Sequence, residues 1–354
     1  MKVFKCSRCG QLIYFENTHC EQCGSPLGFE PDSLELLSLT EDNGFFKTNN
    51  KEDERLYRYC SNHRYDVCNW LVPEENETVF CRACELNRMI PDLNIPEHVH
   101  QWKVVETAKH RLIYSLLRMK LPLVSKSKNE RTGLAFDFIA NINPYDADKV
   151  ITGHHNGIIT INIAEADDVE RETARRLMKE VYRTVLSHFR HEIAHYYWNL
   201  LISGTDNIST FRELFGDERV DYAEALKKHY ETGAPANWNE HFISAYASTH
   251  PWEDWAETWA HYMHIADTLE TAYSFGLTID PKGITTSVSL QAEIKTDPYR
   301  VHDFESIIRL WLPLTFAMNS LNRSMGLNDL YPFIISPPVM KKMKFIHNLI
   351  SRYN

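Results

Sequence analysis

The distribution of cysteine constrains this chain most, because all eight cysteines of its 354 residues lie within the first 84. Four of them form two Cys-x-x-Cys-Gly turns, at residues 6–10 and 20–24. Each turn directs two thiolates into one concavity, and the glycine lets the backbone reverse without a Cβ clash. Two such turns supply a tetrahedral four-sulfur site, so we predict a zinc ribbon whose structural zinc is bound by Cys6, Cys9, Cys20 and Cys23. A disulfide scaffold is the alternative, and it belongs to oxidising compartments.

The other four cysteines are spaced less regularly. Cys81 and Cys84 form another Cys-x-x-Cys pair, whereas seven residues separate Cys60 from Cys68. We predict a second structural zinc bound by these four thiolates. His63, inside the gap, is an alternative ligand, and free buried thiols are the alternative to a metal. A closed four-thiolate site leaves no position for water, so neither site is expected to be catalytic.

Composition and charge narrow the class of protein. Hydrophobic residues make up 43% and charged residues 24%, which is typical of a globular chain rather than a disordered one. No stretch reaches the ~18 apolar residues that span a bilayer, and the N-terminus lacks the apolar region of an export signal. We therefore expect a cytoplasmic protein with no membrane partner.

The charge distribution argues against nucleic acid as a partner. The net charge is −10, and residues 1–99 contain 10 Lys and Arg against 17 Asp and Glu. Sequence-independent affinity for nucleic acid comes from a basic field, which neither half of the chain offers. Residues 1–28 alone carry a charge of +1, so recruitment of the ribbon to nucleic acid is the weaker alternative.

The pattern along the chain predicts three regions: a zinc ribbon at 1–28, an acidic connector with the second four-cysteine module at 29–97, and a larger domain at 98–354. Apolar alternation predicts strands at 134–139 and 157–163. Helical spacing predicts helices at 98–119, 170–201 (in one or two pieces), 210–231, 239–247, 252–270, 303–325 and 337–352. The expected fold class is α+β, mostly helical.

The segment His-Glu-Ile-Ala-His at residues 191–195 is the candidate catalytic motif. His191 and His195 lie one turn apart on one helix face, so both imidazoles can reach one metal ion. Glu192 is rotated to the side of the metal, where it can act as general base on a zinc-bound water whose pKa is lowered toward ~7. The alternative is a chance match on a surface helix, but apolar and aromatic neighbours indicate a buried segment.

An open zinc site needs a third protein ligand, and two acidic clusters compete for that role. Pro251 opens a helix that carries Glu253 in its first turn and Glu257 one turn later. Glu253 is the favoured ligand, because Glu257 could then accept the spare N–H of a ligand histidine and fix its tautomer. Asp217 and Glu218 form the competing cluster.

Tyr246 lies seven residues before Glu253 and is predicted to donate a hydrogen bond to the oxyanion of a tetrahedral intermediate. The alternative is a tyrosine that only packs. His250 and His261 are further possible donors, more readily explained as structural or rim residues. The strand at 158–163 is predicted to be an edge strand that pairs with an extended peptide.

These motifs resemble a known family, the bacterial zinc-binding metallopeptidases with an N-terminal zinc ribbon. The resemblance covers nearly the whole chain, from the paired cysteine turns through the segments at 68–72, 152–157, 188–198, 215–218 and 250–261. It implies a zincin-like (gluzincin-like) metallopeptidase domain after the ribbon.

A second similarity concerns the site alone. The segment Glu-Asp-Trp-Ala-Glu at residues 253–257 is similar to a helix of the catalytic domain of anthrax lethal factor, and Tyr246 keeps the spacing of its tyrosine. This likeness implies zinc ligation by Glu253, orientation of a histidine by Glu257 and oxyanion support by Tyr246. The chain departs from it at Asp254 and Trp255 and in a longer span after His195.

The sequence therefore predicts a zinc-dependent peptidase that acts on a peptide or protein and binds three zinc ions, one catalytic and two structural. The alternative is a metal-stabilised binding or adaptor protein with the same fold and no peptidase activity. In either case, the N-terminal zinc region could bind a protein partner.

Overall fold

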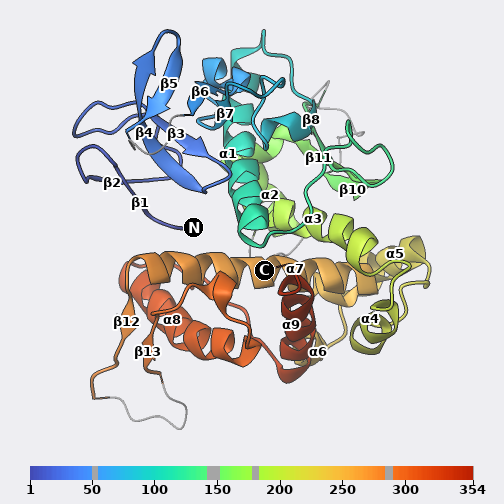
Figure 1. Cartoon of the computed structure of the whole chain (residues 1–354). Coiled ribbons are helices and arrows are strands. Elements are labelled where there is room, and N and C mark those ends of the chain that lie inside the picture. Colours follow the sequence, from blue (N-terminus) through green and yellow to red (C-terminus); the bar gives the residue numbers. More distant parts are fainter. Residues whose placement is uncertain (50–54, 142–151, 178–182, 284–289, 354) are drawn as a thin grey trace. The chain divides into compact units, whose positions relative to one another are not determined.

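The structure is a computed structural model, and it describes residues 1–49, 55–141, 152–177, 183–283 and 290–353 (Figure 1). The chain divides into two compact units. The first unit contains Lys2–Arg118 and Pro122–Phe189. The second contains Arg190–Asn354, together with Met1 and Met119–Leu121.

The first unit begins with two small antiparallel sheets. One pairs β1 (Phe4–Lys5) with β2 (Leu12–Ile13). The other has five strands in chain order, each antiparallel to the next: β3 (Leu27–Glu30), β4 (Glu35–Asp42), β5 (Phe45–Thr48), β6 (Leu56–Tyr59) and β7 (Leu71–Pro73). Short 3-10 helices η1 (Ser61–Tyr65) and η2 (Cys84–Leu86) follow β6 and β7.

The acidic connector predicted from residue 29 onward is wrong, because three strands of this sheet occupy that region. Leu36 and Leu39 of β4 are buried, whereas its acidic residues lie mainly on the exposed side or at the strand ends. Asn43 and Gly44 have positive φ values of 53° and 85° and form the two-residue turn that joins β4 to β5. Such an Asn-Gly pair suits the twist of a tight hairpin, so the turn residues belong to a sheet rather than a linker.

A second sheet in the first unit has the strand order β10-β11-β9-β8. Its strands are β8 (Asn87–Met89), β9 (Ala135–Ile139), β10 (Gly153–His155) and β11 (Ile158–Asn162), so the strands predicted at 134–139 and 157–163 are confirmed. The prediction that residues 158–163 form an edge strand is wrong, because β11 pairs with β9 on one side and β10 on the other. Asn156 and Gly157 make the turn that folds β10 back onto β11.

Helix α1 (Pro96–Arg118) lies in this compact unit. Its Tyr114 packs against Phe15 of the ribbon, with ring centroids 5.5 Å apart, and Phe15 packs against Phe29 at 4.8 Å. Trp70 completes the cluster 4.6 Å from Phe29. The first helix after the boundary predicted near residue 97 therefore packs on the aromatic core of the ribbon region. The 3-10 helix η3 (Ile163–Ala166) and helix α2 (Asp168–Leu177) end the described part before α3.

In its described residues, the second unit has helices and one pair of strands, β12 (Thr278–Ile279) and β13 (Ala292–Glu293). Its helices are α3 (Val185–Leu201, from Arg190), α4 (Ile208–Phe215), α5 (Tyr222–Thr232), α6 (Trp238–His241), α7 (Pro251–Ser274), α8 (Phe304–Ser324) and α9 (Pro337–Ile350), with 3-10 helices η4 (Tyr246–Ser248) and η5 (Pro298–Arg300). Strands come early and helices later, which confirms the α+β class.

Two predicted helices are shorter than expected. The one at 210–231 is two helices, because Gly216 takes a φ of 102° and ends α4. The one at 239–247 is α6 followed by the short η4. The long helix at 170–201 is observed as α2 and α3, and residues 178–182 between them lie outside the described residues.

Helix α7 forms the core of the second unit. Its Trp255, Trp259 and Met263 are fully buried. Buried Asp254 of α7 pairs with Lys342 of α9 at 2.6 Å, and burial raises the pKa of Asp254 to about 7 even though Lys342 lowers it. This core holds α7 in a fixed register against its neighbours.

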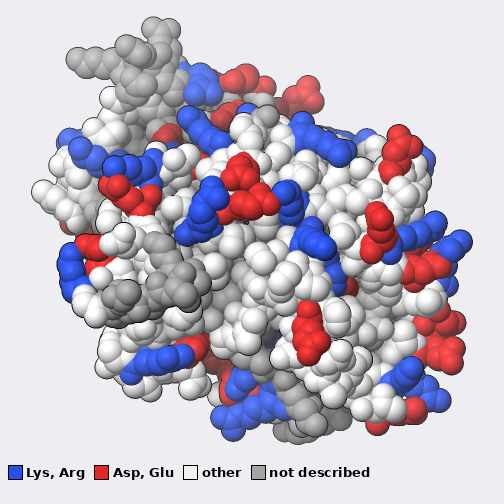
Figure 2. Space-filling model, turned by 90° about the horizontal axis from the view of Figure 1, so that it is seen from below, with Lys and Arg blue, Asp and Glu red and all other residues white. Residues whose placement is uncertain are grey.

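Within the described residues, no helix has both the length and the apolar character that crossing a membrane requires. The face in Figure 2 shows Lys and Arg interspersed with Asp and Glu rather than gathered by sign.

Candidate metal centre

Helix α3 carries the two histidines of the candidate centre. Ile193, Ala194 and Tyr197 are buried, so this part of α3 is packed on one side. His191 and His195 are one turn apart, and their Nε2 atoms lie 3.2 Å from each other. Their side chains remain 12% and 18% exposed, so solvent reaches the point that both nitrogens face.

Helix α7 supplies the carboxylates. Pro251 takes the first helical position, and the ring of His250 caps the helix by accepting a hydrogen bond from the backbone N–H of Trp252 at 3.1 Å. Trp255 donates its indole N–H to the carbonyl of Ala194 at 2.8 Å. This bond joins α7 directly to the helical turn between the two histidines.

Glu253 completes a group of three donors. Its carboxylate is almost fully buried, with Oε2 2.9 Å from His191 Nε2 and Oε1 3.6 Å from His195 Nε2. Two ligand atoms about 2.1 Å from a tetrahedral zinc ion lie about 3.4 Å apart. The separations of 2.9, 3.2 and 3.6 Å between the two imidazole nitrogens and the Glu253 carboxylate are close to that distance. The donor set, two imidazoles and one carboxylate, is also one that open zinc sites use.

Glu257 fixes the orientation of the first histidine. His191 donates from Nδ1 to Glu257 Oε1 at 2.8 Å, which leaves Nε2 of the neutral ring with a lone pair. Ser244 donates to the other oxygen of Glu257 at 2.6 Å. The lone pair of His191 Nε2 therefore faces Oε2 of Glu253, a buried oxygen without a hydrogen bond among the described residues. Two electron-rich atoms in this position need a cation between them, which is a proton on Nε2 in the metal-free site and a metal ion in the loaded one.

The pKa values of these groups also favour a cation at the site. Burial alone would lower the pKa of His191, but the carboxylates of Glu253 and Glu257 outweigh burial and raise it well above its usual value. Burial would raise the pKa of Glu253, but His195 and His191 lower it to about 2. Burial lowers the pKa of His195. The site therefore keeps Glu253 ionised and attracts positive charge.

Two tyrosines lie at this group, and sequence reasoning identified only one. Tyr222, the first residue of α5, donates its hydroxyl to Glu253 Oε1 at 3.0 Å. Tyr246 of η4, the predicted oxyanion donor, has its ring centroid 6.0 Å from that of His191. Burial, and then the charge of Glu253, raises the pKa of Tyr246 well above its usual value, so it stays protonated. No spacing rule marks Tyr222, which is brought to Glu253 only by the fold.

Glu192 is half-buried on α3 beside His191. It does not belong to the three donors that converge. Its charge partly opposes the lowering of the His195 pKa by burial and adds to the raised pKa of Tyr222, so its carboxylate lies in the field of the same site. This position agrees with a residue that acts next to a metal rather than on it.

The competing acidic cluster is engaged elsewhere. Asp217 accepts from Arg219 at 2.7 and 2.8 Å, and Glu218 accepts from Arg212 at 2.5 and 2.9 Å. The structure therefore brings Glu253, rather than this cluster, to the two histidines.

The two other candidate histidines of this unit have local partners. His250 donates to the carbonyl of Val220 at 3.2 Å, beyond its capping role in α7. His261 bonds Tyr331 at 2.9 Å. Both are placed as structural residues.

The first cysteine quartet lies in the first unit. Sγ of Cys6 is 3.8 Å from Sγ of Cys23, and Sγ of Cys9 is 3.6 Å from Sγ of Cys20. A disulfide would place two sulfurs about 2.05 Å apart, whereas ligands of a tetrahedral zinc ion lie about 3.8 Å apart. The sulfurs are therefore arranged as in a metal site, not as in disulfides.

The second quartet has the same spacing, with Sγ of Cys68 3.7 Å from Sγ of Cys81. All four sulfurs, from Cys60, Cys68, Cys81 and Cys84, lie within 4.8 Å of one another. His63 is not part of this group, because its Nδ1 donates to the carbonyl of Cys68 at 2.7 Å.

Sequence reasoning missed the polar residues that α1 adds beside the second quartet. Glu106 Oε1 lies 3.3 Å from Cys84 Sγ, and His110 Nε2 lies 3.4 Å from Cys68 Sγ. Lys109 pairs with Glu106 at 2.5 Å, although both side chains are fully buried. Their positions in α1 look like ordinary helix positions in the sequence, so only the packing identifies them.

Known proteins resemble this chain over nearly its whole length. Residues 98–349 match a family described as "Putative zinc-binding metallo-peptidase", and residues 3–95 match a zinc-ribbon domain. Uncharacterised proteins of Mycobacterium bovis and of two strains of Mycobacterium tuberculosis are 41% identical over 356 residues, which cover 99% of this chain and 95% of each relative. No solved structure matches it significantly. With three donors spaced for zinc on α3 and α7, and two cysteine quartets in an N-terminal ribbon region, the chain belongs to this family of zinc-binding metallopeptidases.

Proposed function

We propose that the protein is a zinc-dependent peptidase in which His191, His195 and Glu253 hold the metal and Glu192 is the general base. The observation that carries the proposal is the convergence of His191, His195 and Glu253, with both histidines still open to solvent. The two Nε2 atoms lie 3.2 Å apart, and the Glu253 carboxylate lies 2.9 Å from that of His191 (by Oε2) and 3.6 Å from that of His195 (by Oε1). Three protein donors and one open position are the arrangement of a hydrolytic rather than a structural zinc site.

A zinc ion bound there would polarise a peptide carbonyl and lower the pKa of a water molecule toward ~7. Glu192 accepts the proton of the attacking water and delivers it to the leaving amine. Tyr246, kept protonated by its raised pKa, donates a hydrogen bond to the carbonyl oxygen as that oxygen gains negative charge. Glu257 holds the His191 ring in its tautomer throughout.

We also infer three zinc ions per chain, two of them in the closed cysteine quartets. None of the eight cysteines is in a disulfide, which suits a protein that works in the reducing cytoplasm. The substrate is a peptide or protein, because the proposed residues are those of amide hydrolysis.

The test replaces Glu192 with glutamine. Glu192→Gln removes the base but leaves all three donor side chains, so the purified variant should retain its zinc and lose peptide cleavage by roughly 10²- to 10⁴-fold. Glu213→Gln, an exposed glutamate on α4, is the matched control and should cleave like the unaltered protein.

Digestion of a broad peptide library, read by mass spectrometry, measures the cleavage. If the zinc-loaded, unaltered protein cleaves nothing in that library, the alternative function holds, which is a binding or adaptor protein with a zincin fold. Full activity in Glu192→Gln would reject the assignment of the base.

A further inference from the structure

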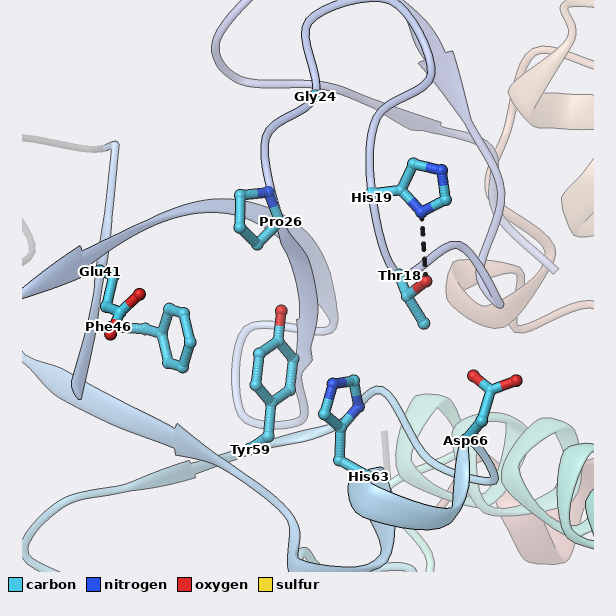
Figure 3. Close-up of a pocket in the computed structure, with 9 residues that line it drawn as sticks. All are labelled: Thr18, His19, Gly24, Pro26, Glu41, Phe46, Tyr59, His63 and Asp66. Carbon is cyan, nitrogen blue, oxygen red and sulfur yellow. Dashed lines mark hydrogen bonds between the residues drawn. The ribbon is translucent and has the colours of Figure 1, made fainter. Parts of the chain in front are cut away.

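A cavity of about 440 Å³ opens in the first unit, the unit that does not contain His191 and His195. It lies between the second cysteine turn of the ribbon and the five-stranded sheet. Its walls are Thr18, His19, Gly24, Pro26, Glu41, Phe46, Tyr59, His63 and Asp66. Figure 3 shows Tyr59, His63 and Asp66 on one side of the opening, with Thr18 and His19 facing them.

Aromatic rings make up one wall. Tyr59 and His63 stack with their centroids 3.9 Å apart and their planes 9° apart, and Phe46 meets Tyr59 at 4.9 Å. The hydroxyl of Tyr59 is bound to the carbonyl of Leu27 at 2.9 Å, so this residue offers the cavity its ring rather than a polar tip. Flat aromatic walls bind planar cations through the negative face of the ring.

The polar groups of the cavity are mainly acceptors. The carboxylate of Glu41 makes no hydrogen bond or ion pair with any residue in the described part of the chain. Because His63 donates from Nδ1 to the carbonyl of Cys68, Nε2 is the ring nitrogen left to accept a hydrogen bond. Asp66 adds a second carboxylate, already paired with Lys103. Among the residues that the structure describes, no lysine or arginine lines the cavity.

We propose that this cavity binds an arginine side chain presented by a basic segment of a partner protein. A guanidinium group is planar, cationic and rich in donors, so it can lie against the ring of Phe46, the cross-strand partner of Glu41, while it donates two hydrogen bonds to Glu41. Residues 1–99 carry 17 acidic against 10 basic residues, which attracts a basic partner to this region. The site is separate from the proposed peptidase centre and does not depend on it.

The experiment uses the full-length, zinc-loaded chain and two fluorescent peptides of identical sequence that carry either arginine or citrulline in a Gly-Ser context. Citrulline has nearly the shape of arginine without its charge. We expect the arginine peptide to bind at least roughly tenfold more tightly, with affinity that falls as salt is raised. Mass spectrometry after the titration confirms that the peptides are intact.

Two isosteric variants locate the site. Glu41→Gln should weaken binding of the arginine peptide roughly tenfold, whereas Glu75→Gln, an exposed glutamate of the same unit outside the cavity, makes the same change in net charge and should leave it unchanged. Equal binding of the two peptides, no saturable binding of either, or equal effects of the two variants would overturn the proposal.

Discussion

Glu253 is held by more than its histidine neighbours, and this matters for any metal that it binds. A buried carboxylate with one oxygen on a metal needs a donor for the other oxygen, or it can rotate and lose its position. Tyr222 is placed to be that donor, 3.0 Å from Glu253 Oε1. We therefore expect the Tyr222 hydroxyl to increase the affinity of the site for zinc.

Tyr222→Phe keeps the ring and removes only the hydroxyl. We expect the affinity for zinc at the open site to fall by roughly 10- to 100-fold, the usual effect of removing a hydrogen bond that orients a ligand. Competition with a chromophoric chelator measures it. Tyr230→Phe, a largely exposed position on the same helix, is the control and should bind zinc normally. Unchanged affinity in Tyr222→Phe would show that the hydroxyl does not position Glu253.

His261 should make the second unit sensitive to acid. Burial lowers its pKa to about 4, from about 6.5 in the unfolded chain. Between these values the unfolded chain binds the extra proton, so the contribution of this residue is complete above pH 6.5 and is lost as the pH falls toward 4. The shift corresponds to about 3 kcal/mol at most.

Urea unfolding of the unaltered protein and of His261→Gln, at pH values from 7 to 4.5, tests this expectation. Glutamine can still bond Tyr331 but cannot titrate, so the loss of unfolding free energy on acidification should be smaller in the variant. Part of the loss remains, because burial also lowers the pKa values of His195 and His264. The same pH dependence in both proteins would contradict the assignment.

At the scale of elements, two Asn-Gly turns connect neighbouring strands in the sheets of the first unit. Asn43 and Gly44 close the β4–β5 hairpin, and Asn156 and Gly157 close the β10–β11 hairpin. The two turns differ in their surroundings. A Cβ added to Gly157 would lie 2.3 Å from the carbonyl oxygen of Gly133, whereas one added to Gly44 would meet nothing within 4 Å.

Gly157→Ala should therefore destabilise the first unit more than Gly44→Ala does. Both variants force alanine into a left-handed conformation, at a cost of about 1 kcal/mol. Gly157→Ala must in addition displace backbone, which we expect to cost a further 1 to 3 kcal/mol or so. Urea unfolding of the zinc-loaded proteins, followed by tryptophan fluorescence, compares the two. Equal losses of unfolding free energy in the two variants would mean that the backbone at Gly133 can shift at little cost.

The same turns explain where sequence reasoning failed. Periodicity located most helices within a few residues, because long apolar stripes such as that of α7 are strong local signals. The β4–β5 hairpin was missed because its acidic residues and its Asn-Gly pair resembled a linker, although Asn-Gly between apolar runs is itself a hairpin signal. The edge assignment of residues 158–163 failed for the same reason at Asn156 and Gly157.

The candidate site divides along similar lines. Residues on one helical turn, such as His191 with His195 and Glu253 with Glu257, could be paired by spacing alone. Spacing could not show that the two pairs meet. That prediction used the argument that Glu257 would orient a ligand histidine, and the observed approach of Glu253 to His191 and His195 agrees with it. Tyr222 could not be foreseen, since its approach to Glu253 depends on where Gly216 ends α4 and on how α5 then packs.

At the scale of the whole molecule, the three candidate metal sites are divided between the two units. Both cysteine quartets lie in the first unit, and the group of His191, His195 and Glu253 lies in the second. Closed thiolate sites contribute folding free energy directly, because their ligands converge only in the folded chain. The open site can lose its metal while the buried core around α7 remains.

Metal content should therefore change in separate steps. We expect three zinc ions per unaltered chain, measured by plasma emission spectrometry against protein concentration. His191→Ala should lower the count to two and leave the melting temperature of the first unit unchanged. The double variant Cys6→Ser/Cys9→Ser should also bind two, but with a destabilised first unit, because Phe15 and Phe29 pack beside the ribbon.

Loss of all zinc from either protein would mean that the sites fold and bind together rather than separately. In that case the two cysteine quartets of the N-terminal region would control whether the open site forms at all. Retention of two ions in each variant would instead show that the ribbon region folds and binds zinc independently of the open site. The cavity at Glu41 and Tyr59 would then keep its shape whether or not zinc is bound at the open site.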